Sequence, residues 1–581
     1  MRLTLSGFTG EIPRLLPRNL PPNAAQIAQN VRLTDGGLVA VRKARVEETL
    51  SAPVDEWLTI YKFGATWLSW ETVVSVAPAP IAADRLYYTG DGTPKMLDGV
   101  TEYELALPGP TGALTGTLGG VGAGDVFSRV YVYTWVTGFG EESEPSPASN
   151  TVAWQAGNTV TLSGFASTPS GRNITKQRIY RSQTGASGGT SLFFIAERAA
   201  ANTNYVDSIA VDTAVEPIPS ISYNPPPAGL EGLTALPNGM MAAFVGKSLY
   251  FSEPYQPHAW PEAYILTVDY PIKALGATGQ GLVVATEGTP YLCTGTTPDA
   301  MTLERIDTNL PCASARSMVD LGYSVAYATP DGIAIVSTNA AQVVTEALFN
   351  RDLWQTYTPS SMIGGQFNSR YVLAFDYIEP TTGLAAKGAF FMDLRNPSAT
   401  LTRGAFAATA MFYEVTTGKL FYLEALDIME WDPPGEISDS MYYFTKPYVT
   451  GGAINFSFIR VDSGLPITQA EIDAIEDAIL AAIAANAAAF AADLGGDLDG
   501  AAIDVFALNG DALVQAPTIG RDTTINLYCD GVFRQSITQA DAEVRLKANY
   551  MGRRWQIEIL GTLPIERISL AQSAVELKDE S

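Results

Sequence analysis

Short strand-and-turn units follow one another along most of the chain, and this feature constrains the fold more than any other. Between Leu249 and Leu348, runs of apolar and aromatic residues alternate with turns rich in Gly, Pro, Asp and Asn. The units recur roughly 33 to 48 residues apart, which is close to the length of a propeller blade. We therefore predict an all-β protein with a β-propeller-like body, and the repeats leave the number of blades open. The units begin near residues 249, 282, 323, 371 and 419.

Composition shifts and turn-rich stretches divide the chain into five segments. The first looks like an extended, proline-rich arm with a short helix over residues 24–29 that Asn23 caps. A glycine-rich run at 116–124 is predicted to be a linker into a module of short strands typical of a β-sandwich. The segments are an N-terminal arm (1–45), a first propeller-like part (46–107), an inserted fibronectin III-like sandwich (108–222), a propeller-like main body (223–440) and a C-terminal β domain (441–581).

One helix is predicted inside the C-terminal domain, at about residues 468–492. Thr468 and Glu471 form a capping box at its start. Its large apolar residues recur at helical spacing, and its other face is mostly alanine, which lets another backbone come close. We expect this helix to pack on both sides, in a contact between subunits. The candidate contact residues are Ile472, Ile475, Ile479, Ile483 and Phe490.

The chain is acidic, yet it carries few charged residues. With 36 basic and 61 acidic side chains its formal net charge is −25, and only 17% of the residues are charged, against roughly 25% in ordinary domains. Such a charge excludes a wide surface that grips nucleic-acid phosphates. If copies of the chain surround passing DNA, carboxylates in the bore would keep the polymer from adhering. The acidity can equally serve solubility alone.

Cysteine usage and apolar patterning predict a cytoplasmically made protein without a membrane span. Cys293, Cys312 and Cys529 have no paired-ligand spacing, so we expect free buried thiols rather than disulfides or a zinc site. The first residues lack the pattern of a secretory signal. Because no run of about 18 strongly apolar residues occurs, no stable membrane insertion is expected.

The motifs that resemble catalytic or metal-binding signatures each have a simpler interpretation. Residues 185–189 match G-x-S-x-G, but the pattern places them between two strands, whereas a hydrolase needs a strand-to-helix turn. The aspartates of 493–511 lack two ligand positions of an EF-hand loop, which favours a solvated turn over a weak calcium site. The single histidine, His258, lies in a proline-rich turn, and adjacent acids such as Glu141 and Glu142 arise by chance in so acidic a chain. We predict no catalytic residue, no cofactor and no metal.

Several short sequence segments spread over the chain, called phrases below, share one resemblance. They are FSEPYQPHAWP at 251–261, VDYPI at 268–272, TEGTPYL at 286–292, PCASARSM at 311–318 and YATPDGIAIV at 327–336, with an opening phrase at 8–42 and a closing strand pair at 553–577. In these phrases the chain resembles the large virion structural proteins of short-tailed bacteriophages, called tail nozzle, tail tubular protein B or phage stabilisation proteins. The phrases carry no catalytic signature.

The resemblance implies a structural role in the virion tail, after assembly in the host cytoplasm. It implies a homo-oligomeric ring, a hexamer, that forms the nozzle or distal tail tube and conducts DNA without sequence-specific binding. The implied partners are a tail adaptor protein, the portal complex and tail fibres. Two alternatives stay open: a receptor-binding adhesin, and a tailspike-like glycan depolymerase, which would need arginines gathered at one end of the blades. Arginines that recur in the blades without a distinctive spacing are Arg305, Arg316, Arg351, Arg370 and Arg395.

Overall fold

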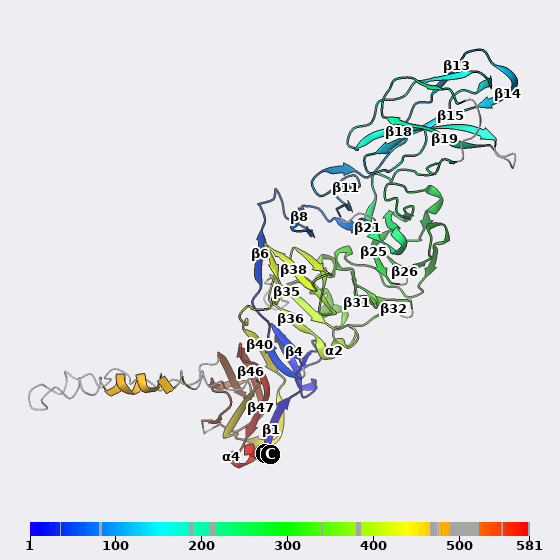
Figure 1. Ribbon diagram of the computed structural model, residues 1–581. Helices are drawn as coiled ribbons and strands as arrows, with labels where there is room; N and C mark the ends of the chain where they lie inside the picture. Colours follow the sequence, from blue (N-terminus) through cyan, green and yellow to red (C-terminus); the bar gives the residue numbers. More distant parts are fainter. Residues whose placement is uncertain are drawn as a thin grey trace, which may run out of the picture.

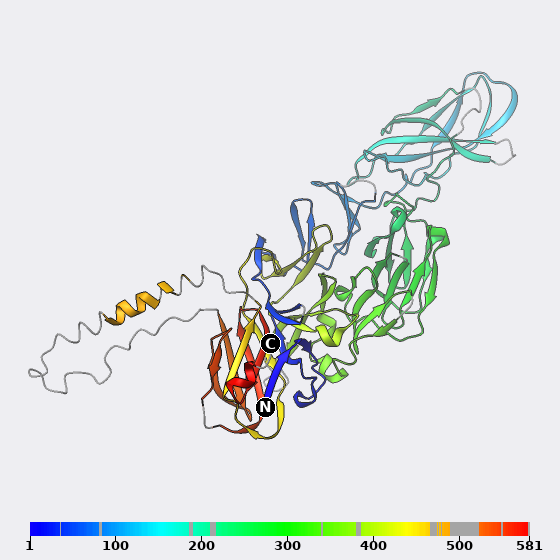
Figure 2. The same ribbon diagram turned by 60° about the horizontal axis from the view of Figure 1, so that its bottom comes forward.

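The computed structural model contains three β-rich parts in a row (Figure 1). The sandwich lies at one end, the propeller-like body in the middle, and the C-terminal β domain at the other end, where both chain termini lie (Figure 2). The predicted all-β class is confirmed. The structure describes residues 1–34, 36–80, 84–184, 190–209, 216–279, 281–338, 341–378, 385–464, 473, 476–477, 479–487, 522–547 and 550–578.

Four blades of the body are antiparallel sheets of four consecutive strands. In each of them the strands pair in chain order, so every blade is a simple meander joined to the next by one connection. The first contains β9 (Ser75–Pro78), β10 (Leu86–Thr89), β11 (Lys95–Leu97) and β12 (Glu102–Glu104); the second β21 (Glu231–Ala235), β22 (Met241–Val245), β23 (Ser248–Phe251) and β24 (Leu266–Thr267); the third β25 (Ile272–Thr278), β26 (Gly281–Thr286), β27 (Tyr291–Thr294) and β28 (Thr302–Arg305); the fourth β29 (Val319–Asp320), β30 (Val325–Thr329), β31 (Gly332–Val336) and β32 (Ala341–Val343).

Three further units complete the body. The fifth blade contains β33 (Ile363–Phe367), β34 (Arg370–Ile378), β35 (Ala385–Met392) and β36 (Thr402–Gly404); the sixth contains β37 (Ala410–Glu414), β38 (Lys419–Glu424) and β39 (Asp427–Glu430) with β6 (Arg45–Thr49) as its fourth strand; the last unit is the hairpin of β7 (Thr59–Phe63) and β8 (Thr66–Trp70). The first strands touch one another in the order β9, β21, β25, β29, β33, β37 and β7. Val74, next to β9, donates a hydrogen bond to Thr59 of β7 at 3.0 Å, so the last unit also meets the first and seven units of the described chain surround a common centre. The predicted repeat positions 249, 282, 371 and 419 fall on β23, β26, β34 and β38, and position 323 lies two residues before β30, so each marks one of five blades.

The blade strands are apolar on both faces because neighbouring blades cover both. All five residues of β30 are buried. Ala326 and Ala328 face a core that contains Trp354, whereas Val325 and Tyr327 face the core on the opposite side of the sheet. A strand buried in this way reads as a continuous apolar run instead of an alternating one.

The inserted module is a sandwich of short sheets. Tyr131, Tyr133 and Trp135 lie in its core, together with Val160 and Leu162 of the facing sheet. The linker predicted at 116–124 is wrong: this run forms one strand and begins the next, because pairing of the backbone outweighs the poor strand preference of glycine. The strands are β13 (Thr115–Gly119), β17 (Thr159–Ser163) and β20 (Tyr205–Asp207) in one sheet, β15 (Tyr131–Thr137), β18 (Ile174–Thr184) and β19 (Thr190–Ala199) in a second, and β14 (Ala123–Arg129) paired with β16 (Val152–Ala156).

Both ends of the chain build the C-terminal β domain. β1 (Arg2–Ser6) pairs with β47 (Ile565–Ala571), and β3 (Ala24–Gln29) pairs with β40 (Met441–Thr445). The helix predicted at 24–29 is therefore wrong. Ala25 and Ala28 are fully buried in the domain core, where strand pairing and packing override the helix preference of alanine.

The rest of this domain follows the sequence pattern more closely. Trp555, Ile557 and Ile559 alternate along one face of β46 (Gly552–Gly561), inside the closing strand pair predicted at 553–577, and all three are fully buried. The remaining strands are β2 (Thr9–Glu11), β4 (Val31–Thr34), β5 (Gly37–Ala40), β41 (Tyr448–Ile454), β42 (Phe458–Ser463), β43 (Thr523–Cys529), β44 (Val532–Ile537) and β45 (Glu543–Arg545); short helices are α1 (Arg351–Gln355) and α2 (Pro397–Thr400) in the body and α4 (Ala574–Lys578) near the C-terminus.

The N-terminal segment joins the propeller to the C-terminal domain. β3 pairs with β36 of the fifth blade, so one sheet runs through both parts. The fully buried carboxylate of Glu11 accepts hydrogen bonds from the Arg403 guanidinium and from the amide of Ala28, both at 2.8 Å. Burial opposes the charge on Arg403, but the Glu11 carboxylate and the Tyr357 side chain together outweigh burial and raise the pKa of the guanidinium. Residues 1–45 are thus part of the folded body instead of a free arm.

Candidate functional site

A hollow of about 890 Å³ lies at the centre of the propeller. The charged side chains that line it within the described chain are Glu231, Lys273 and Arg316. Arg316 donates to the backbone carbonyls of Leu58 and Thr409, and burial lowers its pKa. Its side chain therefore ties three separate connections together across the ring, which is a structural task.

The described residues contain no group of three or more His, Cys, Asp or Glu side chains that is able to hold a metal ion. The three cysteines are buried and free, as expected. Burial raises the pKa of Cys293 and of Cys312 to about 12, so both remain unreactive thiols at neutral pH. No helix of the described segments combines the length and the apolar character that a bilayer crossing needs.

His258 lies in a turn, as predicted, and is buried where the second blade meets the sandwich. Its Nε2 is 2.9 Å from the carbonyl oxygen of Glu142, and burial lowers its pKa. The Glu142 carboxylate accepts hydrogen bonds from Tyr180 and Arg178 at 2.6 and 2.9 Å, while Glu141 accepts one from Thr137. These acids hold the sandwich together and do not face each other across a ligand site.

Part of the predicted subunit contact lies in the described chain. Ile479 and Ile483 belong to a helical stretch at 479–487, and the side chain of Ile483 is 59% exposed. In both views this helical stretch stands away from the C-terminal β domain (Figures 1 and 2). The contact itself stays a prediction. Ile472, Ile475, Phe490, the G-x-S-x-G run at 185–189 and the aspartate-rich run at 493–511 lie outside the described residues.

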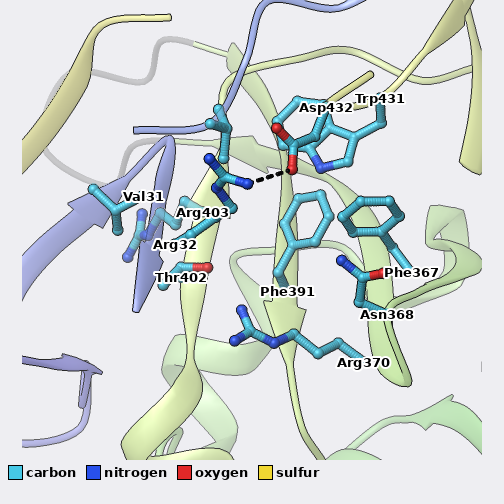
Figure 3. A pocket seen from close by; sticks show the side chains of 11 residues that line it. Val31, Arg32, Phe367, Asn368, Arg370, Phe391, Thr402, Arg403, Trp431 and Asp432 are labelled. Carbon is cyan, nitrogen blue, oxygen red and sulfur yellow. Dashed lines mark hydrogen bonds and ion pairs between the residues drawn. The ribbon is translucent and has the colours of Figure 1, made fainter. Parts of the chain in front are cut away.

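A second hollow, of about 240 Å³, lies where the propeller meets the C-terminal domain (Figure 3). A two-residue turn between β33 and β34 forms part of its wall. Asn368 and Ser369 both have left-handed backbones in this turn, with φ of 49° and 59°, and Phe367 pairs with Arg370 directly across it. The other lining residues are Val31, Arg32, Val41, Phe391, Thr402, Arg403, Trp431 and Asp432.

The three arginines of this hollow differ in their partners. Arg32 forms an ion pair with Asp432 at 3.4 Å, the dashed contact in Figure 3, and Arg403 is held by Glu11. The side chain of Arg370 makes no hydrogen bond or ion pair with any part of the chain that the structure describes. Burial lowers the pKa of Arg370, and the nearest carboxylate that opposes this, Asp393, is already bound by another arginine.

Arg370 is one of the five blade arginines whose spacing in the sequence singles none of them out. The structure separates it from the rest, because the other four have partners and do not gather at one site. They are Arg305, with Asp269 at 3.4 Å; Arg351, with Asp331 at 2.5 Å; Arg395, with Asp393 at 2.8 Å; and Arg316, with backbone carbonyls. The sequence holds no local signal for this difference, since the walls of the hollow come from five separate stretches of chain.

Comparisons with known proteins give likeness to solved structures alone. No family model matches the chain, and no curated protein matches it. Hsv2 of Kluyvelomyces marxianus matches at 11% identity over 49% of this chain and 72% of its own, with a TM-score of 0.23. The AfRom2 CNH domain matches at 10% identity over 49% of this chain and 90% of its own, with a TM-score of 0.24. The extracellular domain of the putative one component system BT4673 from B. thetaiotaomicron matches at 8% identity over 75% of this chain and 49% of its own, also with a TM-score of 0.24. Scores this low support no argument about the chain.

Proposed function

We propose that the protein is a structural subunit of a phage tail, and that copies of it form the nozzle or distal tail tube through which DNA leaves the capsid. The observation that carries this proposal is where the family-like phrases lie. The opening phrase at 8–42 and the closing phrase at 553–577 are more than 500 residues apart in sequence, yet their strands lie in one domain, where β5 pairs with β47. Two ends that resemble one family thus form one folded unit.

The positions of the internal phrases support the same proposal. The phrases at 268–272 and 311–318 each connect one blade to the next, and those at 286–292 and 327–336 each form a turn inside a blade. Equivalent phrases therefore occupy equivalent places in successive blades. Such regular placement favours a common architecture over chance similarity.

The C-terminal domain offers a surface for contact between copies. β44 is an edge strand of the larger sheet, so one side of its backbone lacks a partner among the described strands. Val532 and Phe533 begin this strand and are 52% and 51% exposed, and Val449 and Met551 of the same domain are also exposed. Exposed apolar side chains on an open edge are a liability for a monomer and suit a strand that a neighbour covers. In this proposal a ring of six copies forms along this edge and joins the tail adaptor.

The role proposed here is mechanical and not enzymatic. The buried acids and arginines with known partners serve ion pairs inside the fold, as for Glu11 with Arg403 and Glu142 with Arg178. The net charge of −25 suits a bore from which DNA must slide freely, since carboxylates repel its phosphates. Tail fibres and the portal complex are further proposed partners.

Electron microscopy of the purified protein tests the proposal. We expect rings with an open bore, and we expect the double variant V532D/F533D to give monomers that retain the wild-type circular dichroism spectrum. The matched control is V121D, at a residue that is 92% exposed on the sandwich, and it should still form rings. A wild-type protein that stays monomeric and is missing from virions overturns the proposal. Release of oligosaccharides from capsular polysaccharide would instead support the depolymerase alternative.

A further inference from the structure

The hollow of Figure 3 holds an unmatched positive charge. Arg32, Arg370 and Arg403 line it, whereas the carboxylates paired with these arginines are Asp432, which lines the hollow, and Glu11 behind it. Arg370 is the arginine of this hollow whose side chain has no paired carboxylate in the described chain. A guanidinium that is partly withdrawn from water without a counter-charge costs free energy, and an anion entering the hollow would remove that cost.

The walls around Arg370 are aromatic. Phe391 and Trp431 stack at 5.0 Å between ring centroids with an interplanar angle of 21°, and both are less than 10% exposed. Phe367 contributes a third ring from the turn that positions Arg370. Aromatic walls beside one charged group that has no ion-pair partner in the described chain suit a ligand that has an apolar or ring-shaped body and a single anionic end.

Size and charge narrow the ligand further. The hollow of about 240 Å³ is below the roughly 300–1,000 Å³ of sites for drug-sized molecules, so the ligand is smaller than these. A phosphate monoester carries close to two negative charges at neutral pH and would need two free cations. A carboxylate carries one charge, and the planar fork of an arginine binds it with two parallel hydrogen bonds.

We propose that this hollow binds a small ring-bearing carboxylate, with Arg370 holding the carboxylate and with Phe367 and Trp431 contacting the ring. Asn368 and Thr402 line the same hollow and offer hydrogen bonds to hydroxyl groups, so the ring is either an aromatic ring or that of a sugar acid. The site belongs to one copy of the chain. It goes beyond the proposed tail function and does not depend on it.

Isothermal titration calorimetry on the full chain tests this site with two matched pairs of probes, benzoate with benzamide and glucuronate with glucose. We expect at least one carboxylate to bind, and its neutral counterpart to bind at least about tenfold more weakly, since a charged hydrogen bond is lost. Tighter binding of glucuronate identifies a sugar acid, and tighter binding of benzoate identifies an aromatic acid. No binding of either carboxylate at about 10 mM overturns the proposal, as does inorganic phosphate that binds as tightly as the better carboxylate.

Variants of Arg370 connect binding to the residue. R370Q should weaken the better carboxylate at least about tenfold, and R370K should weaken it less, because lysine keeps the charge but not the planar fork. The control R351Q changes an exposed arginine paired with Asp331 and should bind like the wild type. The melting temperature of R370Q should not fall and should rise slightly, since the substitution removes a partly buried charge whose side chain has no hydrogen bond or ion pair in the described chain. Wild-type affinity in both R370Q and R370K rejects the site.

Discussion

Two β domains flank the propeller, and they are attached to it in different ways. The sandwich is built from one continuous stretch, from β13 to β20, with a core of its own. The C-terminal domain takes strands from both chain ends, and its larger sheet continues into the fifth blade through the pairing of β3 with β36. The first is an inserted module, and the second is interwoven with the body.

The contacts at the two junctions follow this difference. The sandwich meets the body through contacts of its loops, such as His258 with the Glu142 carbonyl, Asn224 with Glu144 at 3.1 Å and Phe139 with Tyr103, and none of its described strands pairs with a strand of the body. The C-terminal domain meets it through a shared sheet and the buried pair of Glu11 with Arg403. A module that shares no sheet with its neighbour can unfold alone, whereas a shared sheet couples two parts into one cooperative unit. Connectivity, more than the type of fold, therefore decides which parts of this protein are independent.

The largest expected effect separates the two domains as isolated fragments. Residues 106–222 expressed alone should fold, because the sandwich core lies within them, apart from a few edge contacts. Residues 441–581 alone should not fold, because β1, β3, β4 and β5 are missing from their sheets. Circular dichroism and the dispersion of amide signals in NMR spectra measure both. A folded 441–581 fragment would show that the C-terminal domain does not need the N-terminal strands for its stability.

The next effect concerns the buried ion pair of the sandwich. The Arg181 Nη1 lies 2.8 Å from the Asp207 carboxylate, with both side chains fully buried, and Tyr131 donates to the same carboxylate at 2.9 Å. D207A should destabilise the sandwich by about 3–5 kcal/mol, because it breaks a fully buried ion pair and removes the acceptor of the Tyr131 hydroxyl. Calorimetry should show an early transition of the sandwich while the main transition stays in place. The control D125A, at an exposed residue of β14, should change stability by less than about 0.5 kcal/mol.

A similar change at the other junction should look different. E11A leaves Arg403 without its carboxylate, at a cost of about 3 kcal/mol, the lower end of the range, because the Arg403 side chain keeps 26% of its exposure. The body and the C-terminal domain should lose stability together, in one shifted calorimetric transition. R351A breaks an exposed pair and should cost less than about 0.5 kcal/mol. If E11A split the transition in two, the coupling through the shared sheet would be refuted.

The smallest effect is a pH dependence at the sandwich junction. Burial lowers the pKa of His258, and Glu141 and Arg172 nearby act in opposite directions on it. Below about pH 6.5, His258 becomes protonated in the unfolded chain but stays neutral in the folded protein. The free energy of unfolding therefore falls with decreasing pH, by at most about 1.4 kcal/mol per pH unit, until the pH passes the pKa of His258 in the folded protein. Chemical denaturation between about pH 5 and 8 measures this slope. H258Q should remove it, and an unchanged slope in that variant would assign the effect to other groups.

Local sequence pattern was enough to predict several parts of this molecule. The recurring turns marked one strand in each of five blades, the short strands after residue 108 marked the sandwich, and the stretch at 553–577 marked the closing strand pair of β46 and β47. Each of these depends on residues close together in the chain. Side-chain alternation and the residue preferences of turns are local properties, so they can be recognised from the sequence alone.

Other parts depend on partners that lie far away in the chain. Residues 24–29 form a strand because β40 and β36 offer their backbones, although an alanine-rich run favours a helix by itself. The glycine run at 116–124 pairs for the same reason. Arg370 stands out only where five distant stretches meet around it. Nearly every residue offers the same backbone donor and acceptor, so the sequence of a segment does not specify which distant strand it pairs with. The closure of the ring, the pairing of the two chain ends and the unpaired charge in the hollow therefore depend on the tertiary structure.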